Sequence, residues 1–344
     1  MLLDKRDPYQ PGSMWYYAPN KGLPIAFGIL FAVSGILHGY QCHKYKSWLV
    51  TGPLPWSALL FTVGFILRAI GAFGEWDNVR VYIASTVFLL AGPPIYEGAN
   101  FLILGRILYY VPYLSPMHPG RVFSTFTFLL SVVEVLTANG AALLANVEAP
   151  ETRRNIGEAL LKAALILQLV LMAGFSSLAI TFNWRCWRAG VLSRKLQHVL
   201  VVLYCSCTLI TTRTVFRTIE YFKATGEHAW DDPSDVDPII KNEWIFWLFE
   251  VVIMYANTTM LNIFHPMMRL PRSNKVYLAK DGVTEVEGPG FKDPRPWFIT
   301  FIDPFDLGGL IFNKGKQEKY WETDAGERPG SKEGNGVVRQ DCHV

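Results

Sequence analysis

Seven long apolar stretches constrain the fold of this chain more than any other feature of its sequence. A helix rises about 1.5 Å per residue, so it needs about 20 mostly apolar residues to cross a hydrocarbon core of about 30 Å. Each stretch meets this requirement, although the third and the fourth each contain a glutamate. Of the 344 residues, 51% are hydrophobic and only 18% are charged. We therefore predict an all-α integral membrane protein with seven transmembrane helices. The expected spans are Leu23–Gln41, Leu54–Phe73, Val81–Leu104, Val122–Ala145, Ala159–Phe182, Leu196–Phe216 and Trp244–Phe264.

The distribution of lysine and arginine predicts the orientation of these spans. Basic residues favour cytoplasmic loops, and here they follow spans one, three, five and seven in regions without acidic residues. These cations are Lys44, Lys46, Arg106, Arg121, Arg185, Arg188, Arg194, Lys195, Arg269, Arg272 and Lys275. The loops on the other side are acidic, and we expect the longest of them, 224–242, to be a solvated loop, with a cap over a site as the alternative. This pattern puts the N-terminus outside and the C-terminus in the cytoplasm.

The topology divides the chain into four segments. Residues 1–21 are expected to be extracellular, and the charges that precede the first apolar stretch argue against a cleaved signal peptide. Residues 22–266 form the seven-helix transmembrane domain. Residues 267–312 are expected to be a membrane-associated cytoplasmic segment, because the stretch 291–312 is aromatic but broken by prolines. Residues 313–344, rich in glycine, lysine and glutamate, are predicted to be a disordered cytoplasmic tail.

Polar side chains inside the expected spans are the candidate substrate-binding residues. Ionisable groups at membrane depth cost free energy, so they must pair, reach water or lose their charge. The candidates are Arg68, Glu97, Glu134, Arg213, Arg217, Glu220, Glu250 and Asn257. Five of them are expected at similar height in the outer half of the bundle, namely Arg68, Arg213, Arg217, Glu220 and Glu250. They form either a polar cavity or ion pairs that hold the helices together.

The positions of these residues along their helices refine the expectation. Spacings of four and three put Arg213, Arg217 and Glu220 on one face of span six. Glu134 is expected near mid-depth and Glu97 closer to the cytoplasm. Two prolines lie three and four positions before Glu97 and free backbone carbonyls there, which predicts either a kink with a functional role or a packing adjustment.

Other motifs exclude several function classes. The seven histidines lie at span ends, in loops or in the tail, so they form no set of metal ligands. We expect His38 to be a hydrogen-bonded structural group, and His118 and His265 to take part in helix capping and turn formation beside proline. No GxxxxGK[ST] motif is present, so transport would use an ion gradient or run downhill. We therefore expect no enzyme activity, no metal, no cofactor and no nucleic-acid partner.

Several longer motifs resemble those of the fungal lipid-translocating exporter family. They read YYAPN before span one, HGYQ at its end, ILRAIG in span two and YEGANFLILGRILYYVPYLSPMHPGRVF across span three. The later ones read VVEVLTANG, LITTRTVFRTIEYF and NEWIFWLFEVVIMYANTTMLNIFHP in spans four, six and seven. The resemblance covers residues 16–312. The chain departs from the family at Phe61, where many members have glutamate, and at Glu97, where many have a small residue.

The resemblance implies a seven-span protein of the plasma membrane that moves a lipid or amphiphile, with toxin resistance as a consequence. Members of the family are associated with phytosphingosine export, aminocholesterol resistance and porphyrin. For a sphingoid-base-like or sterol-like substrate, Glu250, Glu134 or Glu97 would receive a cationic head while the tail stays among apolar helices. The arginines would keep these acids ionised or bind an anionic head instead. The alternative function is a seven-helix sensor or receptor for a lipophilic ligand, which the topology also allows.

Overall fold

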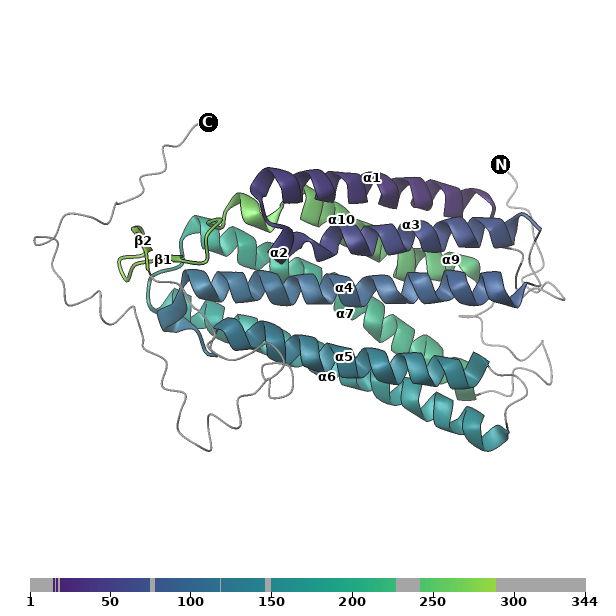
Figure 1. The fold of residues 1–344 in the computed structure, drawn as a ribbon. Coiled ribbons are helices and arrows are strands. Elements are labelled where there is room, and N and C mark those ends of the chain that lie inside the picture. Colours follow the sequence, from purple (N-terminus) through teal and green to yellow (C-terminus); the bar gives the residue numbers. More distant parts are fainter. Residues whose placement is uncertain are drawn as a thin grey trace, which may run out of the picture.

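The computed structural model describes Trp15, Tyr17 and residues 19–74, 78–117, 119–145, 150–226 and 242–288. These residues form an elongated bundle of helices (Figure 1). Four parts of the chain that carried predictions lie outside the described residues, so those predictions stay predictions: the stretch 291–312, the tail 313–344, His118 and most of the acidic loop.

In chain order the elements are α1 (Gly22–Tyr45), α2 (Trp48–Thr51), α3 (Pro53–Ala72), α4 (Val79–Tyr110), η1 (Pro112–Leu114), α5 (Pro119–Ala145), α6 (Glu151–Arg188), α7 (Arg194–Gly226), α9 (Glu243–Phe246), η2 (Trp247–Val252), α10 (Ile253–Ile263), η3 (Pro266–Met268), β1 (Val276–Leu278) and β2 (Glu285–Glu287).

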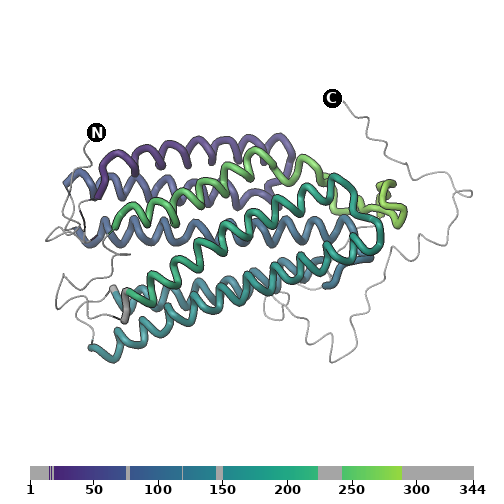
Figure 2. The backbone as a smooth tube through the Cα atoms, turned by 180° about the vertical axis from the view of Figure 1, so that it is seen from behind, coloured from purple at the N-terminus to yellow at the C-terminus, as the bar shows by residue number. Residues whose placement is uncertain are grey.

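The seven predicted spans are confirmed, because seven helices are long and apolar enough to cross a membrane. The seventh is composite and consists of α9, the π-helical segment η2 and α10. Three helices exceed their predicted spans most: α4, α6 and α7 have 32, 38 and 33 residues. At about 1.5 Å per residue they exceed a hydrocarbon core of about 30 Å, so they must tilt or project beyond it. Figure 2 shows α7 crossing the bundle obliquely.

The bundle has two ends that carry different structures (Figure 1). We call the end at which α1 begins the N-terminal end. At the opposite end, which we call the hairpin end, strands β1 and β2 pair antiparallel with Val276 opposite Glu287. This hairpin and η3 are the described part of the segment that the sequence predicted to follow the last span.

Helix α4 occupies the centre of the bundle. It packs against α3, α5 and α7, and 61% of its apolar window is buried, against 17% for α5. Asn78 caps its first turn, since its side chain accepts hydrogen bonds from the backbone N–H groups of Arg80 and Val81. Pro93 and Pro94 lie inside this helix, which is continuous from Val79 to Tyr110, so the prolines do not divide the span.

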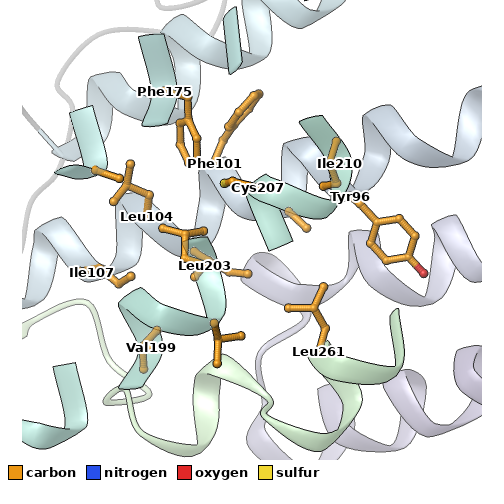
Figure 3. Close-up of a cluster of buried hydrophobic side chains, with 14 of the residues drawn as sticks. Tyr96, Phe101, Leu104, Ile107, Phe175, Val199, Leu203, Cys207, Ile210 and Leu261 are labelled. Atoms are coloured by element: carbon orange, nitrogen blue, oxygen red, sulfur yellow. The ribbon is translucent and has the colours of Figure 1, made fainter. Parts of the chain in front are cut away.

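Apolar side chains from four helices fill the interior between α4 and α7 (Figure 3). Phe101 on α4 and Phe175 on α6 meet with their ring centroids 4.8 Å apart. Leu203 on α7 and Leu261 on α10 belong to the same buried cluster. Polar groups also lie between these helices, since Asn100 Nδ2 on α4 donates to Ser206 Oγ on α7 at 2.9 Å inside the bundle.

Helices α5 and α6 approach each other through glycine. A Cβ atom added at Gly140 would lie 2.9 Å from the carbonyl oxygen of Gly157 and 2.7 Å from Leu161 Cγ. Small residues of this kind let membrane helices pack backbone against backbone. The α5–α6 pair therefore depends on glycine at this crossing.

Candidate substrate-binding site

Four of the predicted site residues form one ion-pair network between α7 and η2. Arg213 Nε donates to Glu250 Oε2 at 2.7 Å, and the two side chains are only 4% and 9% exposed. Arg217 Nε lies 3.9 Å from Glu250 Oε1, and Arg217 Nη1 donates to Glu220 Oε2 at 2.7 Å. The spacing that placed the three α7 residues on one face is confirmed. Glu250 thus faces two guanidinium groups from the neighbouring helix.

The backbone at Glu250 is π-helical rather than α-helical. Six residues, Trp247–Val252, make up this segment. A π-helical turn is wider than an α-helical turn, and such segments occur frequently at functional sites. Trp247 at its start stacks on Phe65 of α3 with ring centroids 5.9 Å apart, whereas Glu250 reaches α7. Sequence reasoning missed this segment because its residues, WLFEVV, continue an ordinary apolar helix pattern.

Arg68 belongs to a separate cluster, which corrects the prediction that it lines the same site as the α7 residues. Its Nη2 atom donates to the Tyr17 hydroxyl at 2.9 Å and lies 3.4 Å from Glu243 Oε1. The guanidinium carbon stands 4.2 Å from the centre of the Phe246 ring and 5.4 Å from that of Trp247. The physical reason is that Glu243, at the start of α9, is a nearer counterion for Arg68 than Glu250.

Glu243 is a functional candidate that the sequence analysis did not single out, because it lies between the acidic loop and the expected seventh span. Besides Arg68, it binds the chain before α1, because the backbone N–H of Asn20 donates to both of its carboxylate oxygens at 3.0 Å. Its position at the edge of span seven, opposite an arginine one turn from the end of span two, was the signal that could have found it.

Glu97 lies in the interior with an amide partner. Its carboxyl group is fully buried, and Gln168 Nε2 donates to its Oε1 atom at 2.6 Å. Its other oxygen has no hydrogen-bond partner among the described residues. Arg213 is close enough to interact electrostatically with both Glu97 and Glu134. Glu134 itself is half-buried on α5, and Arg213 is the charged group that acts on its carboxyl group.

Asn257 is fully buried on α10, and neither atom of its amide group has a hydrogen-bond partner among the described residues. It lies one turn before Leu261, which faces the α7 side of the interior in Figure 3, so both share a helix face. Buried amides without partners are uncommon and cost free energy. This is therefore a point at which a polar ligand group or water would be stabilised.

The histidine predictions have different outcomes. His38 Nε2 forms a hydrogen bond with Thr258 Oγ1 at 3.1 Å inside the α1–α10 contact, so it is the structural group that was expected. His265 was expected to take part in capping and turn formation beside proline. It occupies the N-cap position of η3, and its carbonyl oxygen accepts a hydrogen bond from the Met268 N–H at 3.0 Å, so it forms the expected turn. Its side chain makes no capping bond, and its ring stacks on Tyr45 with 5.1 Å between the centroids.

An apolar groove between α1 and α3 lies on the outside of the bundle. It has a volume of about 630 Å³, and Gly28, Ala32, Thr62, Phe65 and Phe73 are among the residues that line it. Phe65 forms part of its wall and also stacks on Trp247, which lies under Arg68. One aromatic layer therefore separates the groove from the Arg68–Glu243 cluster. None of the eight predicted site residues lines this groove.

Comparison with known proteins matches this chain to one family and to several relatives with related names. The family model described as RTA1 like protein matches residues 55–273. A protein of Leptosphaeria maculans called lipid-translocating exporter-like protein RTA1 is 39% identical over 90% of this chain, which spans only 61% of that relative. A protein of the same name from Ajellomyces capsulatus is 31% identical, over 80% of this chain and 87% of its own. The probable lipid transporter atnI of Emericella nidulans is 24% identical, over 74% and 68%. No solved structure matches the chain significantly.

Proposed function

The chain belongs to the family of RTA1-like proteins, and from this premise we propose that it moves a lipid or another amphiphile across the membrane that its seven helices span. Relatives named lipid-translocating exporter-like protein and probable lipid transporter support this proposal. We further propose a sphingoid-base-like or sterol-like substrate, the plasma membrane as the site of action, and toxin resistance as the consequence.

The observation that carries the proposal is the ion-pair network of Glu250 with Arg213 and Arg217 inside an apolar bundle. Intramembrane charges are expensive and mark substrate pathways. A cationic head group would compete with the two guanidinium groups for Glu250, and an anionic head group would compete with Glu250 for them. A cationic head that paired with Glu250 would release Arg213, which also interacts electrostatically with Glu97 and Glu134, so these two acids would offset part of the charge that loses its partner.

The tail of an amphiphile needs a different environment, which the α1–α3 groove supplies. Its volume of about 630 Å³ falls within the range of ordinary ligand sites, about 300–1,000 Å³. Phe65 and Trp247 connect the wall of the groove to the Arg68–Glu243 cluster. A molecule with its tail in the groove would therefore place its head near the charged residues of the N-terminal end.

The charges at the two ends of the bundle support one orientation in the membrane. The lysines and arginines that the sequence analysis placed on one side flank the helices at the hairpin end, and basic flanks favour the cytoplasm. We propose that the N-terminal end faces outward, so that Arg68 and Glu243 lie toward the outer leaflet. Without a nucleotide-binding motif, movement would run downhill or use an ion gradient.

Reconstitution of the purified chain in liposomes tests this function. Fluorescent analogues of a sphingoid base, a glycerophospholipid and a sterol are compared, and an impermeant quencher reports which analogues change leaflet. We expect movement of one class, its loss in Glu250→Gln, and its retention in Glu158→Gln. The latter is a matched control, because it removes one carboxylate from a pair with Lys162 at 3.7 Å in which both side chains are 31% exposed.

Two results would oppose the proposal. If no analogue moved in vesicles that contain folded, correctly inserted protein, the sensor function would replace transport and a ligand-binding screen would follow. If Glu250→Gln moved the substrate at the wild-type rate, the network would be a structural element only, and the substrate path would lie elsewhere.

A further inference from the structure

A second pocket lies at the hairpin end, where α7 begins and the seventh span has just ended. Its volume is about 400 Å³. Three cations line it, namely Lys195, Arg269 and Arg272, together with apolar groups from Tyr45, Met268 and Leu270. The pocket thus combines positive charge with apolar surface, and it is remote from the Glu250 network at the other end of α7.

The three cations have no counterion within the described part of the chain, in which no ion pair involves them. The one acid of the pocket, Glu285, accepts a hydrogen bond from the Tyr110 hydroxyl at 2.9 Å. The pocket lining therefore carries a positive excess that a bound anion would balance.

The start of α7 adds to this positive potential. The N-terminus of a helix carries the positive end of the macrodipole, where acidic side chains are favourable and basic ones are not. The first turn of α7 contains no acidic residue and begins with Arg194 and Lys195. A position at which the sequence departs from such a preference, with no neighbouring group that offsets the cost, often has a function. An anion in the pocket would supply the negative charge that the start of α7 lacks.

Helix α4 and the segment after it hold the walls of this pocket in place. Arg106 Nη2 donates to the carbonyl oxygen of Pro271, between two of the pocket cations, at 2.7 Å. Tyr113 donates from its hydroxyl to the Ala279 carbonyl oxygen at 2.9 Å, and burial raises the pKa of Tyr113 to about 12, so this donor stays protonated. The segment 269–285 is thereby fixed to the bundle, and the pocket is preformed.

The position of the pocket identifies the source of the anion. Arg269 and Arg272 follow the last apolar span, which ends at Met268, and Lys195 lies at the start of the sixth. The three cations are therefore at the end of the apolar spans, at the height of the lipid head groups. Cations there would bind phosphate, and the neighbouring Met268, Leu270 and Tyr45 would contact the glycerol and upper acyl chains. We propose that this pocket binds the phosphorylated head group of an anionic membrane lipid, such as a phosphoinositide.

The topology rule alone would also put cations at this end, but it does not account for the arrangement. Basic residues at the hairpin end need only be numerous to orient the bundle. Three of them around one preformed pocket with an apolar wall go beyond that requirement. This inference is independent of transport, because it concerns a lipid that stays bound at one interface.

Binding of short-chain phosphatidylinositol phosphate to the purified full-length chain in detergent tests the inference. The wild type is compared with Arg269→Gln/Arg272→Gln, and with Arg188→Gln/Lys280→Gln as a control. The control removes the same charge from exposed residues at the same end that do not line the pocket. Phosphatidylcholine of the same chain length, inositol phosphate and inorganic phosphate serve as further probes.

We expect the pocket variant to bind the phosphoinositide at least about tenfold more weakly than both the wild type and the control, since charge-assisted hydrogen bonds are lost. Lys195→Gln should weaken binding in the same direction and covers the case in which the double variant does not fold. Equal binding by all folded variants would overturn the site, as would an equal loss in the control. Equally tight binding of inositol phosphate or inorganic phosphate would overturn the assignment to a lipid.

Discussion

Replacing Glu250 by leucine should cost about 3–5 kcal/mol of unfolding free energy, because it leaves a buried guanidinium without its counterion. Arg213 makes its only described ion pair with Glu250, at 2.7 Å. Arg217 suffers less, since it keeps Glu220 at the same distance. Arg213→Met should be similarly destabilising, because it leaves Glu250 with Arg217 at 3.9 Å only.

The double variant Arg213→Met/Glu250→Leu should recover most of the lost free energy. Replacing a whole buried ion pair by apolar residues of similar volume is often neutral or stabilising, so the coupling energy should be about 3 kcal/mol or more. The four proteins are unfolded in detergent micelles by increasing SDS, and tryptophan fluorescence reports the transition. A coupling energy below about 0.5 kcal/mol would show that the two side chains act independently and would refute the pairing.

The same double variant separates packing from function. If the network serves only to hold α7 against η2, a variant with restored stability should also move lipid at the wild-type rate. If the network receives the head group, the variant should fold and reach the membrane but fail to transport. Lys162 and Glu158 provide the reference cycle, because an exposed pair three to four residues apart on one helix contributes only about 0.3–0.5 kcal/mol.

Three further substitutions test other parts of the structure, each by the same unfolding measurement. Arg68→Lys keeps the charge but loses the planar stacking on aromatic rings, so we expect a loss of about 1–2 kcal/mol, and no loss would refute the stacked geometry. Gly140→Ala should cost about 1–3 kcal/mol of unfolding free energy, because the added Cβ atom would lie less than 3 Å from atoms of α6. Gly174→Ala should be neutral, because its Cβ atom would have nothing within 4 Å. Equal effects of the two substitutions would disprove the close α5–α6 crossing. Glu97→Leu leaves the Gln168 amide buried without its acceptor and should cost about 1–3 kcal/mol of unfolding free energy. Glu97→Gln keeps an acceptor and should cost less. A larger loss in Glu97→Gln than in Glu97→Leu would contradict the hydrogen bond.

The number and order of the spans could be predicted because hydropathy is a property of each stretch by itself. A helix that must satisfy its own backbone in lipid needs only length and apolar side chains to be recognised. The ends were less predictable: α6 begins at Glu151 and α7 continues to Gly226, where polar residues extend a helix beyond the apolar stretch. Hydropathy measures where the lipid contact ends, whereas the backbone hydrogen bonds of a helix can continue into water.

The part of the candidate site that depends on one helix alone was predictable from the sequence. Spacing along one helix fixed the common face of Arg213, Arg217 and Glu220, because that face depends on local geometry alone. The choice of partners between helices was not fixed by spacing. It depends on the rotation of each helix and on which counterion is nearest, and so Arg68 pairs with Glu243 rather than joining the network.

The π-helical segment explains why span seven can serve both clusters at once. Residues three apart in an α-helix share a face, yet Trp247 packs on Phe65 and under Arg68 toward α3, while Glu250 pairs with Arg213 of α7. The wider π-helical turn rotates these two side chains further apart than an α-helix would. A regular helix at this point would rotate one of them away from its partner, so the π-helical turn lets span seven contact α3 and α7 from residues only three positions apart.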